Sequence, residues 1–269
     1  MDLGSGSCKA FSGDSFQELT SIKLNPNSPP GANRENDNGI YDPETGLFYI
    51  GDRGDRSVPG SKGSIEIVDT RSGTYVGSIT VDDSDPAGLA LDPGTSKIYV
   101  VLGMTSRVAV IDRKKREVLT TWPITGGPLP HALALDAVHQ RLFIGSRIKK
   151  GYIYKPGKMV IMDATNGKVI DAVDSEGGVD ELVYEPSNQR VYFTGTTGGI
   201  DVFKQLDSDR YRRLGLVPTG ALAKTSLYVR ELQRLFVAVP KHVILTPPVP
   251  ESNEATIEDA KILVFQVVP

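Results

Sequence analysis

The sequence has a single cysteine, Cys8, and only three histidines among 269 residues. One cysteine excludes an internal disulfide and any structural zinc site built from cysteine ligands. Three histidines leave few candidates for acid–base catalysis. The chain also lacks a glycine-rich phosphate loop, a nucleophile elbow, a zinc-binding helix motif and a readable Ser/His/Asp order. Motifs of the common catalytic classes are therefore missing.

Long hydrophobic runs and an excess of basic residues are missing as well. Because no stretch of about 18 consecutive apolar residues occurs, a transmembrane helix is excluded. The first residues, MDLGSGSCKAFSG, have no basic segment followed by an apolar one, so we expect neither a signal peptide nor a membrane anchor in this chain. The net charge of −3 gives no global basic field, which disfavours nucleic acid as an obligatory partner.

Turn-forming residues are plentiful, and they divide the chain into short strands. The chain has 28 glycines and 18 prolines, and apolar residues make up 39%, enough for a core. The most regular stretch, residues 88–121, reads GLALDPGTSKIYVVLGMTSRVAVIDRKKREVLTT. Its four runs are rich in β-branched residues and bounded by Gly, Pro, Asp or Ser, which predicts four strands joined by hairpins.

The same cassette recurs along the chain. The acidic residue that ends its first strand falls at Asp42, Asp92, Asp136 and Glu185, and the fifth copy has Arg230 there. The spacings are 50, 44, 49 and 45 residues, close to the roughly 40 to 50 residues of a propeller blade. The second strands align as LFYIG from Leu47, KIYVV from Lys97, RLFIG from Arg141, RVYFT from Arg190 and RLFVA from Arg234. The third strands align as IEIVD from Ile65, VAVID from Val108, MVIMD from Met159, IDVFK from Ile200 and ILVFQ from Ile262.

These repeats predict an all-β fold, a β-propeller of four-stranded antiparallel blades in one domain over residues 1–269. We expect repeats at about 37–81, 85–124, 130–175, 179–219 and 223–269. The last repeat lacks a fourth strand, whereas residues 1–24 contain segments that fit a third and a fourth strand. Residues 1–24 are therefore either a strand that closes the ring or a partial blade, in which case the chain is part of a longer propeller.

The pattern xLALDP, a turn, KIYVV, then VAVID resembles the YVTN-type β-propeller repeat proteins, over the range from Cys8 to Pro269. Members of that family are often periplasmic or surface proteins, and they usually carry a signal peptide and seven blades. The resemblance implies a periplasmic or extracellular location. It specifies how blades are built and not what chemistry they perform.

Candidate site residues gather where the first strands begin, at the mouth of the central channel. In three repeats the residue five positions before the aligned acid is polar or charged, namely Asp37, His131 and Asp180. In two of these repeats the next residue is polar or charged as well, namely Asn38 and Glu181. Carboxylate, amide and imidazole groups are ligands for Ca²⁺, Mn²⁺ or Zn²⁺, and a bound metal would polarise a carbonyl group or activate water. The alternative is that these side chains solvate a water-filled channel and cap loop amides.

The loops between second and third strands are unequal in length. They are short at residues 103–106 and 195–199, and long at 51–63, 146–157 and 240–260. Long loops on one face of a rigid scaffold often carry recognition. The third blade's loop holds basic and aromatic residues suited to anions, carbohydrate or an acidic protein patch, namely Arg147, Lys149, Lys150, Tyr152, Tyr154 and Lys155. The alternative is a solvated loop packed on itself.

We therefore expect a non-catalytic propeller that binds a protein partner or a small ligand through its loop-rich face. A second hypothesis is a metal-dependent hydrolase or lyase of the lactonase type, with its site at the channel mouth and a divalent cation as cofactor. It rests on analogy between folds. A third is that the chain is a subunit of a larger assembly, with another chain completing the last blade.

Overall fold

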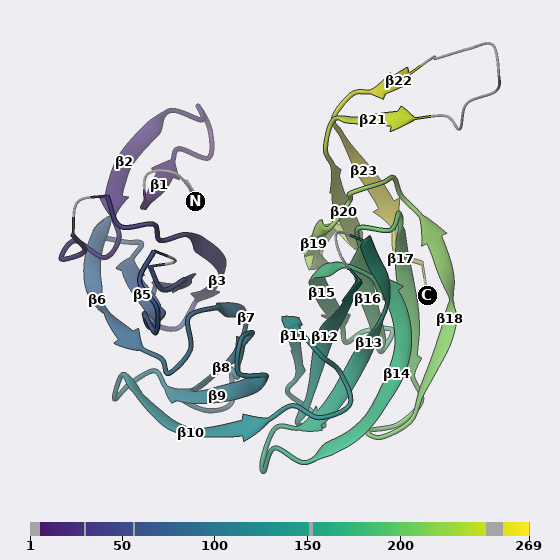
Figure 1. The fold of residues 1–269 in the computed structure, drawn as a ribbon, viewed down its shortest axis with the longest axis horizontal. Helices are drawn as coiled ribbons and strands as arrows, with labels where there is room; N and C mark the ends of the chain where they lie inside the picture. The colour runs from purple at the N-terminus through teal and green to yellow at the C-terminus, as the bar shows by residue number, and fades with distance from the viewer. Residues whose placement is uncertain (1–5, 30, 56, 151–152, 246–254, 269) are drawn as a thin grey trace.

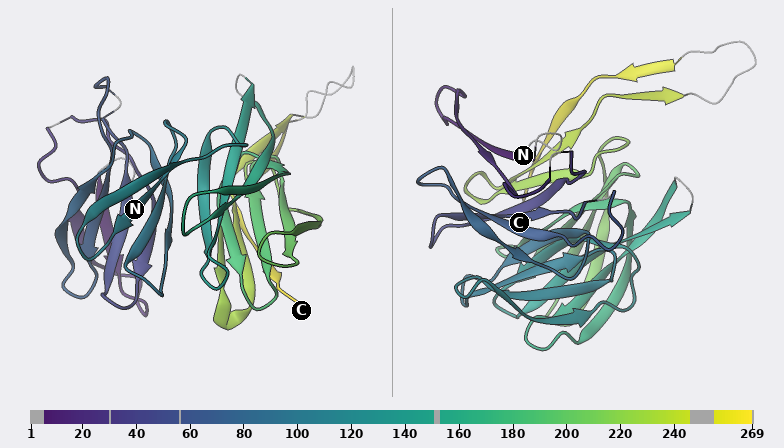
Figure 2. Two further views of the ribbon diagram at one scale, coloured as in Figure 1. Left: turned by 90° about the horizontal axis from the view of Figure 1, so that it is seen from below. Right: turned by 60° about the vertical axis from the view of Figure 1, so that its left-hand side comes forward.

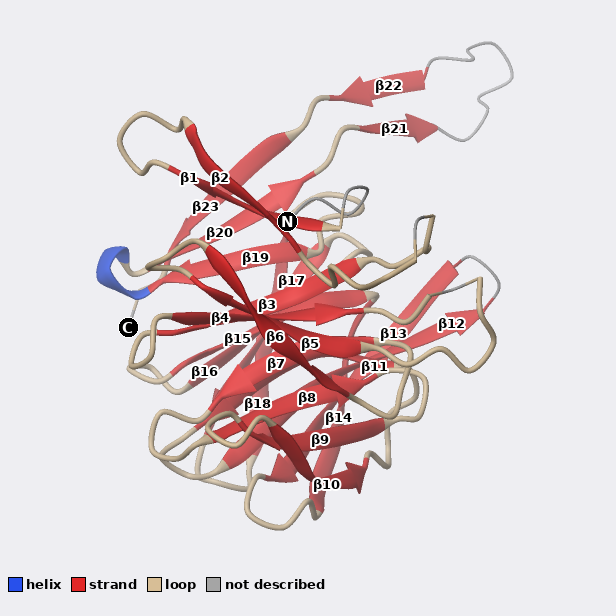
Figure 3. Ribbon diagram, turned by 90° about the vertical axis from the view of Figure 1, so that its left-hand side faces the viewer, coloured by secondary structure: helices blue, strands red, loops and turns tan. Residues whose placement is uncertain are grey.

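Short antiparallel strands form nearly all of the regular secondary structure in the described chain. The computed structural model describes all residues except 1–5, 30, 56, 151–152, 246–254 and 269. Within the described residues, the one helical element is a 3-10 turn, η1 (Arg230–Leu232), as Figure 3 shows. In the same part of the chain no helix is long and apolar enough to cross a membrane.

Four sheets have four strands each, and every strand pairs with the next one along the chain. Blade 1 contains β3 (Asn36–Asp42), β4 (Leu47–Asp52), β5 (Ser64–Asp69) and β6 (Thr74–Thr80). Blade 2 contains β7 (Pro86–Leu91), β8 (Lys97–Leu102), β9 (Arg107–Asp112) and β10 (Glu117–Pro123). Blade 3 contains β11 (Pro130–Asp136), β12 (Arg141–Lys150), β13 (Ile153–Asp163) and β14 (Val169–Gly177). Blade 4 contains β15 (Val179–Glu185), β16 (Arg190–Gly195), β17 (Gly199–Gln205) and β18 (Tyr211–Pro218).

The two ends of the arc of blades are built differently from its middle (Figure 1). Blade 5 has three strands in the described chain, β19 (Thr225–Val229), β20 (Arg234–Val239) and β23 (Lys261–Gln266). The hairpin of β21 (His242–Leu245) and β22 (Ala255–Glu258) extends from it as a separate sheet. At the other end, β1 (Ser7–Phe11) and β2 (Glu18–Lys23) pair only with each other among the described strands.

The predicted all-β propeller is confirmed. The five second strands begin at the residues where the repeats place them, Leu47, Lys97, Arg141, Arg190 and Arg234. The predicted closing strand takes another position, because β2 pairs with β1 and β23 pairs with β20. The N-terminal segment is thus a two-stranded partial blade in this structure.

Apolar side chains are buried mainly between neighbouring blades. Each of four clusters joins two consecutive blades: blades 1 and 2, 2 and 3, 3 and 4, and 4 and 5. A fifth cluster holds the partial blade on blade 1, where Ile22 and Leu24 pack against Ile50 and Val68. The stack of blades is therefore stabilised one interface at a time, as expected of a repeat fold.

The recurring acid at the end of the first strand is buried in blades 1 to 4, and in blades 1 to 3 it contacts the next blade. Asp42 accepts a hydrogen bond from Thr45 Oγ1 in its own turn (2.6 Å) and forms an ion pair with Arg113 of blade 2. Asp136 likewise accepts a hydrogen bond from the amide of Gln205 of blade 4 at 2.9 Å. The acid thus closes the turn that follows it, as Asp commonly does, and receives a donor from the next blade.

The long connections of blades 1, 3 and 5 project from one side of the molecule, as expected from the repeat pattern (Figure 2). Two of them contain more strand than the sequence suggested. β12 and β13 continue as a paired hairpin as far as Lys150 and Ile153. The connection over residues 240–260 contains the β21–β22 pair.

Candidate functional site

A break in strand pairing shapes the channel mouth. Four first strands have a register shift near their start, at residues 36–39, 86–89, 130–132 and 179–181. A β-bulge of this kind bends the strand and redirects a side chain, and bulges are frequent beside functional sites. Asp37, His131 and Asp180 all lie at these breaks, so their side chains lean across the channel toward one another.

His131 is the centre of the resulting group. Its buried imidazole Nε2 lies 3.2 Å from Asp180 Oδ1 and 3.9 Å from Asp37 Oδ2. The three residues come from β11, β15 and β3, and so from blades 3, 4 and 1. The structure thereby brings together residues separated by up to 143 positions in the chain, which the repeat alignment places at equivalent positions of their blades.

Arg53 neutralises the carboxylates on the blade 1 side of the channel mouth. Its guanidinium group lies 2.5 Å from Asp37 Oδ2, 2.5 Å from Asp85 Oδ1 and 3.1 Å from Glu35 Oε2. One partly buried cation therefore holds three carboxylates, one of which belongs to the neighbouring blade. The hydrogen bonds from Arg53 to Asp37 and Glu35 are charge-assisted and fix geometry as well as charge.

Asp180 is held on the opposite side by two cations. Arg147 forms an ion pair with Oδ1 and donates its Nε–H to the carbonyl oxygen of Val179 at 2.5 Å, and Lys224 Nζ lies 3.0 Å from Oδ2. Burial opposes ionisation of Asp180. The hydrogen bond and charge of His131, with the charge of Arg147 and the contact with Lys224, outweigh it and lower the pKa well below its usual range.

Glu181 behaves in the opposite way. Its side chain has no ion pair and makes no hydrogen bond within the described residues. Burial, together with the negative charges of Asp180 and Asp37, raises its pKa to about 8. At neutral pH Glu181 is therefore mostly a neutral acid beside a cluster of paired charges.

The arrangement resembles an ion-pair network more than a metal site. Among the described residues, no group of three or more His, Cys, Asp or Glu side chains is placed to hold a metal ion. Arg53 contacts one oxygen of Asp37, and Arg147 and Lys224 contact the two oxygens of Asp180. Asn38 lies at the same bulge as Asp37, and its side chain makes no hydrogen bond in the described chain. Metal binding by Asp37, Asn38, His131, Asp180 and Glu181 stays a prediction.

The predicted ligand loop of blade 3 is only partly described. Arg147 turns inward to Asp180, whereas Lys155 is exposed. The backbones of Lys149 and Tyr154 pair across the β12–β13 hairpin. Tyr152, and the side chains of Lys149, Lys150 and Tyr154, lie outside the described part of the structure.

The repeat pattern did not predict that Arg53 and Lys224 belong to the site, or that Arg147 forms an ion pair with Asp180. A signal for the two arginines was present. LFYIGDR and RLFIGSR, which begin at Leu47 and Arg141, place an arginine at the same position of two repeats. In both repeats this residue forms an ion pair with an aspartate of a first strand. The alignment did not reveal that Arg147 reaches forward to blade 4 while Arg53 pairs within blade 1.

Comparisons with known proteins extend the description of the fold. No protein-family model matches the sequence, and no curated protein matches it. Solved structures do match. Hydrazine synthase from Kuenenia stuttgartiensis is 15% identical with a TM-score of 0.57, over 85% of this chain and 65% of that one. The propeller of Dos1 is 12% identical with a TM-score of 0.58, over 86% of this chain and 61% of that one.

A third match is a chain in the crystal structure of a nidogen/laminin complex. It is 16% identical with a TM-score of 0.56, over 87% of this chain and 86% of that one. This chain thus spans less than two thirds of the matched hydrazine synthase and Dos1 chains. At these identities the likeness shows a shared β-propeller fold, and the fold alone does not specify function.

Proposed function

We propose that this protein is a non-catalytic binding or scaffold protein that recognises a partner with the loop-rich face of its propeller. The network at the channel mouth carries the proposal. Asp37 and Asp180 are fixed by Arg53, Arg147 and Lys224. Carboxylates held in ion pairs form a preorganised polar surface at the channel mouth. A preorganised surface binds a partner without a large loss of conformational entropy.

The basic hairpin of blade 3 suggests the chemistry of the partner. The paired extension of β12 and β13 lies beside that surface and carries Lys149, Lys150 and Lys155. Lysines on a paired hairpin favour an acidic protein surface through electrostatic complementarity. The nidogen/laminin structure is a complex of proteins, which gives one example of a protein partner in a structure containing this fold.

Charge reversal tests this proposal. The probe is a fluorescein-labelled peptide of alternating Glu and Ser, with binding followed by fluorescence anisotropy at low salt. We expect the double variant Lys149→Glu, Lys150→Glu to weaken binding about tenfold or more, by loss of about 1.4 kcal/mol. The matched control is Lys114→Glu, Lys115→Glu, two exposed lysines in the β9–β10 turn at the opposite end of the blades. Equal losses in both variants would point to nonspecific attraction and contradict the proposal.

A second candidate is a metal-dependent hydrolase or lyase at the channel mouth. The observation that favours it is the neutral acid Glu181 beside the His131–Asp180 pair, since a protonated carboxyl group can donate a proton to a leaving group. Asp37, Asn38, His131 and Asp180 would hold the Ca²⁺, Mn²⁺ or Zn²⁺ ion, which would polarise the bond to be broken, and Glu181 would keep its proton for the leaving group.

Metal analysis separates the two candidates. Purified protein is incubated with each cation, desalted and assayed for metal content. Stoichiometric metal that disappears in Asp180→Asn and His131→Ala would favour the enzyme. Wild-type protein that retains no more metal than these variants would favour the binding protein.

We also propose membership of the YVTN-type repeat proteins and a periplasmic or extracellular location. The repeated xLALDP and KIYVV strands support the family, and the location follows from the resemblance alone. Fractionation of the producing cells, with the protein detected by antibody, tests the location. Recovery with cytoplasmic markers would contradict it.

A further inference from the structure

The loop-rich face carries opposite charges on neighbouring blades. On blade 3, the paired ends of β12 and β13, residues 147–150 and 153–158, contain five basic residues and no acidic one. We call these residues the basic hairpin. The segment that leads into blade 2, residues 81–86, contains three aspartates and no basic residue. Lys155 of the hairpin and Asp82 of the segment are both exposed.

The acidic segment lies on the same face as the basic hairpin. The backbone N–H of Gly54, in the long loop of blade 1, donates a hydrogen bond to the carbonyl oxygen of Ser84 at 2.9 Å. On the other side of the segment, the N–H of Gly103, in the β8–β9 turn, donates to the carbonyl oxygen of Asp85 at 2.9 Å. The segment is thus fixed between two connections of blades 1 and 2 that belong to the loop-rich face.

These three connections enclose a pocket with an excess of negative charge, which we call the acidic pocket. It has a volume of about 390 Å³, and Arg53, Asp55 and Asp85 line it. Arg53 is the one cation among the described lining residues, and it contacts Asp37 as well as Asp85. In the described chain, the hydrogen bonds to the Asp55 carboxylate come from uncharged donors. One guanidinium group is therefore shared by more than one carboxylate.

Exposed apolar side chains border both charged surfaces. Val58 and Met104 line the acidic pocket and are 53% and 69% exposed. Leu129 is 48% exposed, and its carbonyl oxygen accepts a hydrogen bond from the N–H of Arg147, so Leu129 lies at the base of the basic hairpin. Protein interfaces commonly have an apolar centre, in which methionine is enriched, and a polar rim. The face therefore combines apolar groups with a charged surface of each sign.

We propose that this face binds a second copy of the chain, with a two-fold axis between the acidic pocket and the basic hairpin. Under that symmetry the basic hairpin of each copy lies against the acidic pocket of the other. The charges identify the occupant, because the partner must present a negative and a positive surface side by side and the chain itself does so. The inference rests on the proposed function, since it identifies the acidic partner surface as blades 1 and 2 of a second copy.

Exchange of charge between the two surfaces tests the proposal. Sedimentation velocity of the full chain at low salt measures the dissociation constant of the dimer, and we expect a dimer that forms as the concentration rises. One variant, Asp82→Lys with Asp85→Asn, removes negative charge from the acidic side. The other, Lys150→Gln with Lys155→Glu, removes positive charge from the hairpin. Each variant alone should dimerise about tenfold more weakly or worse, because the charge attraction is lost.

A mixture of the two variants distinguishes this contact from others. The altered acidic side of one variant meets the altered hairpin of the other, and their unaltered surfaces stay complementary. An equimolar mixture should therefore dimerise within about threefold of the wild type. The matched control is Lys114→Glu with Lys115→Glu, in the turn at the opposite end of the blades. It should dimerise like the wild type.

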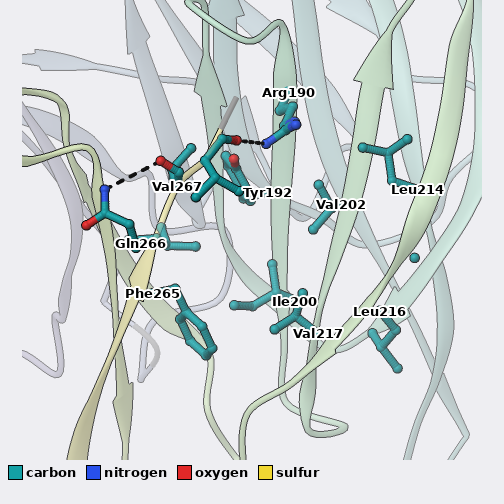
Figure 4. Close-up of a pocket in the computed structure, with 13 residues that line it drawn as sticks. Arg190, Tyr192, Ile200, Val202, Leu214, Leu216, Val217, Phe265, Gln266 and Val267 are labelled. Carbon is teal, nitrogen blue, oxygen red and sulfur yellow. Dashed lines mark hydrogen bonds between the residues drawn. The ribbon is translucent and has the colours of Figure 1, made fainter.

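A second control concerns the apolar groove between blades 4 and 5, which Figure 4 shows. Leu214 lines this groove and is 45% exposed. Leu214→Asp should leave the dimer unchanged, because the groove lies outside the proposed contact. Loss of the dimer in this variant would place the contact in the groove and contradict the proposal.

Three other results would overturn it: a wild type that stays monomeric, charge variants that dimerise like the wild type, and a mixture that dimerises no better than its components. The binding assay with the acidic peptide separates this failure from failure of the proposed function. A monomeric chain that binds the peptide through Lys149 and Lys150 would overturn the inference alone. The proposed function would then stand, with a different acidic protein as the partner.

Discussion

The acid that ends the first strand has two tasks in blades 1 to 3, and Asp42 shows both. It accepts hydrogen bonds from its own turn, from the backbone N–H of Glu44 and the hydroxyl of Thr45. It also receives the guanidinium of Arg113 from blade 2, which in turn contacts Glu44 Oε2 at 2.6 Å. Because Asp42 and Arg113 are both buried, each compensates the cost of desolvating the other. The repeat residue is thus a link between blades as well as a turn former.

Removing one partner of this pair should be more damaging than removing both. We expect Arg113→Met to destabilise the protein by about 3 to 5 kcal/mol, because it leaves the Asp42 carboxylate buried without a counter-charge. The double variant Arg113→Met, Asp42→Asn should recover part of that loss. Guanidinium chloride unfolding of four proteins measures it: the wild type, Arg113→Met, Asp42→Asn and the double variant. A double variant as unstable as the sum of both single changes would show that the pair is not coupled.

Glu181 should make stability depend on pH in a direction unusual for a carboxylate. Burial, with the charges of Asp180 and Asp37, raises its pKa from 4.5 to about 8. Between these values the folded state binds a proton that the unfolded state has released, so stability falls as pH rises from about 5 to 8. Glu181→Gln keeps the neutral shape and should remove this contribution. Unfolding curves at pH 5, 7 and 9 check it, and identical pH profiles for both proteins would contradict the assignment.

At the scale of the strands, Gly88 of β7 allows two blades to approach closely. A Cβ atom at this position would lie 2.6 Å from the carbonyl oxygen of His131 and 2.6 Å from the backbone N of Leu133. Both atoms belong to the backbone of β11, which cannot rotate away as a side chain would. The glycine therefore fixes the distance between blades 2 and 3 next to the channel mouth.

Gly88→Ala should accordingly destabilise the protein by about 1 to 3 kcal/mol, the usual cost of overpacking. Gly94→Ala is the control, because the nearest atom to its added Cβ would be Asp92 Oδ1 at 3.4 Å, an ordinary contact. Thermal unfolding of both variants gives the comparison. A Gly88→Ala protein as stable as Gly94→Ala would mean that β7 and β11 shift apart at no cost.

The strands could be located from the sequence because each follows a local rule that recurs in every repeat. An apolar run, an acid and a turn place β8 at Lys97 and β16 at Arg190 without any knowledge of neighbours. The channel group of Asp37, His131 and Asp180 followed from the same register. The β21–β22 hairpin did not follow, since it lies in an insertion that the repeats do not share.

The cations of the site were not predictable in the same way. Their partners depend on how far a flexible side chain extends between blades, and the repeat spacing in the sequence carries no information on that distance. The sequence places Arg147 in an outward-facing ligand loop, yet its side chain turns back to Asp180 on the next blade. Lys224 directly precedes β19, the first strand of blade 5, and still reaches the same carboxylate.

At the scale of the whole molecule, stability should decrease from the middle of the arc to its ends. Blades 2, 3 and 4 are buried on both faces by their neighbours. Blade 5 has described neighbours on one face only, and Leu227 and Ile262 are exposed on its strands. In a repeat fold, each interface contributes its own share of the free energy of unfolding. A blade with one interface therefore opens at a lower cost than a blade with two.

Native-state hydrogen exchange should reveal this gradient. We expect the amides of β20 and β23 to exchange about tenfold faster or more than those of β8 and β9, since a difference of about 1.4 kcal/mol in opening free energy has that effect. The comparison is well matched, because in each pair the strands occupy the second and third positions of a blade and differ mainly in the number of covered faces. Equal exchange in both pairs would mean that the blades open only together. In that case the missing interface would lower the free energy of unfolding of the whole molecule and not that of blade 5 alone.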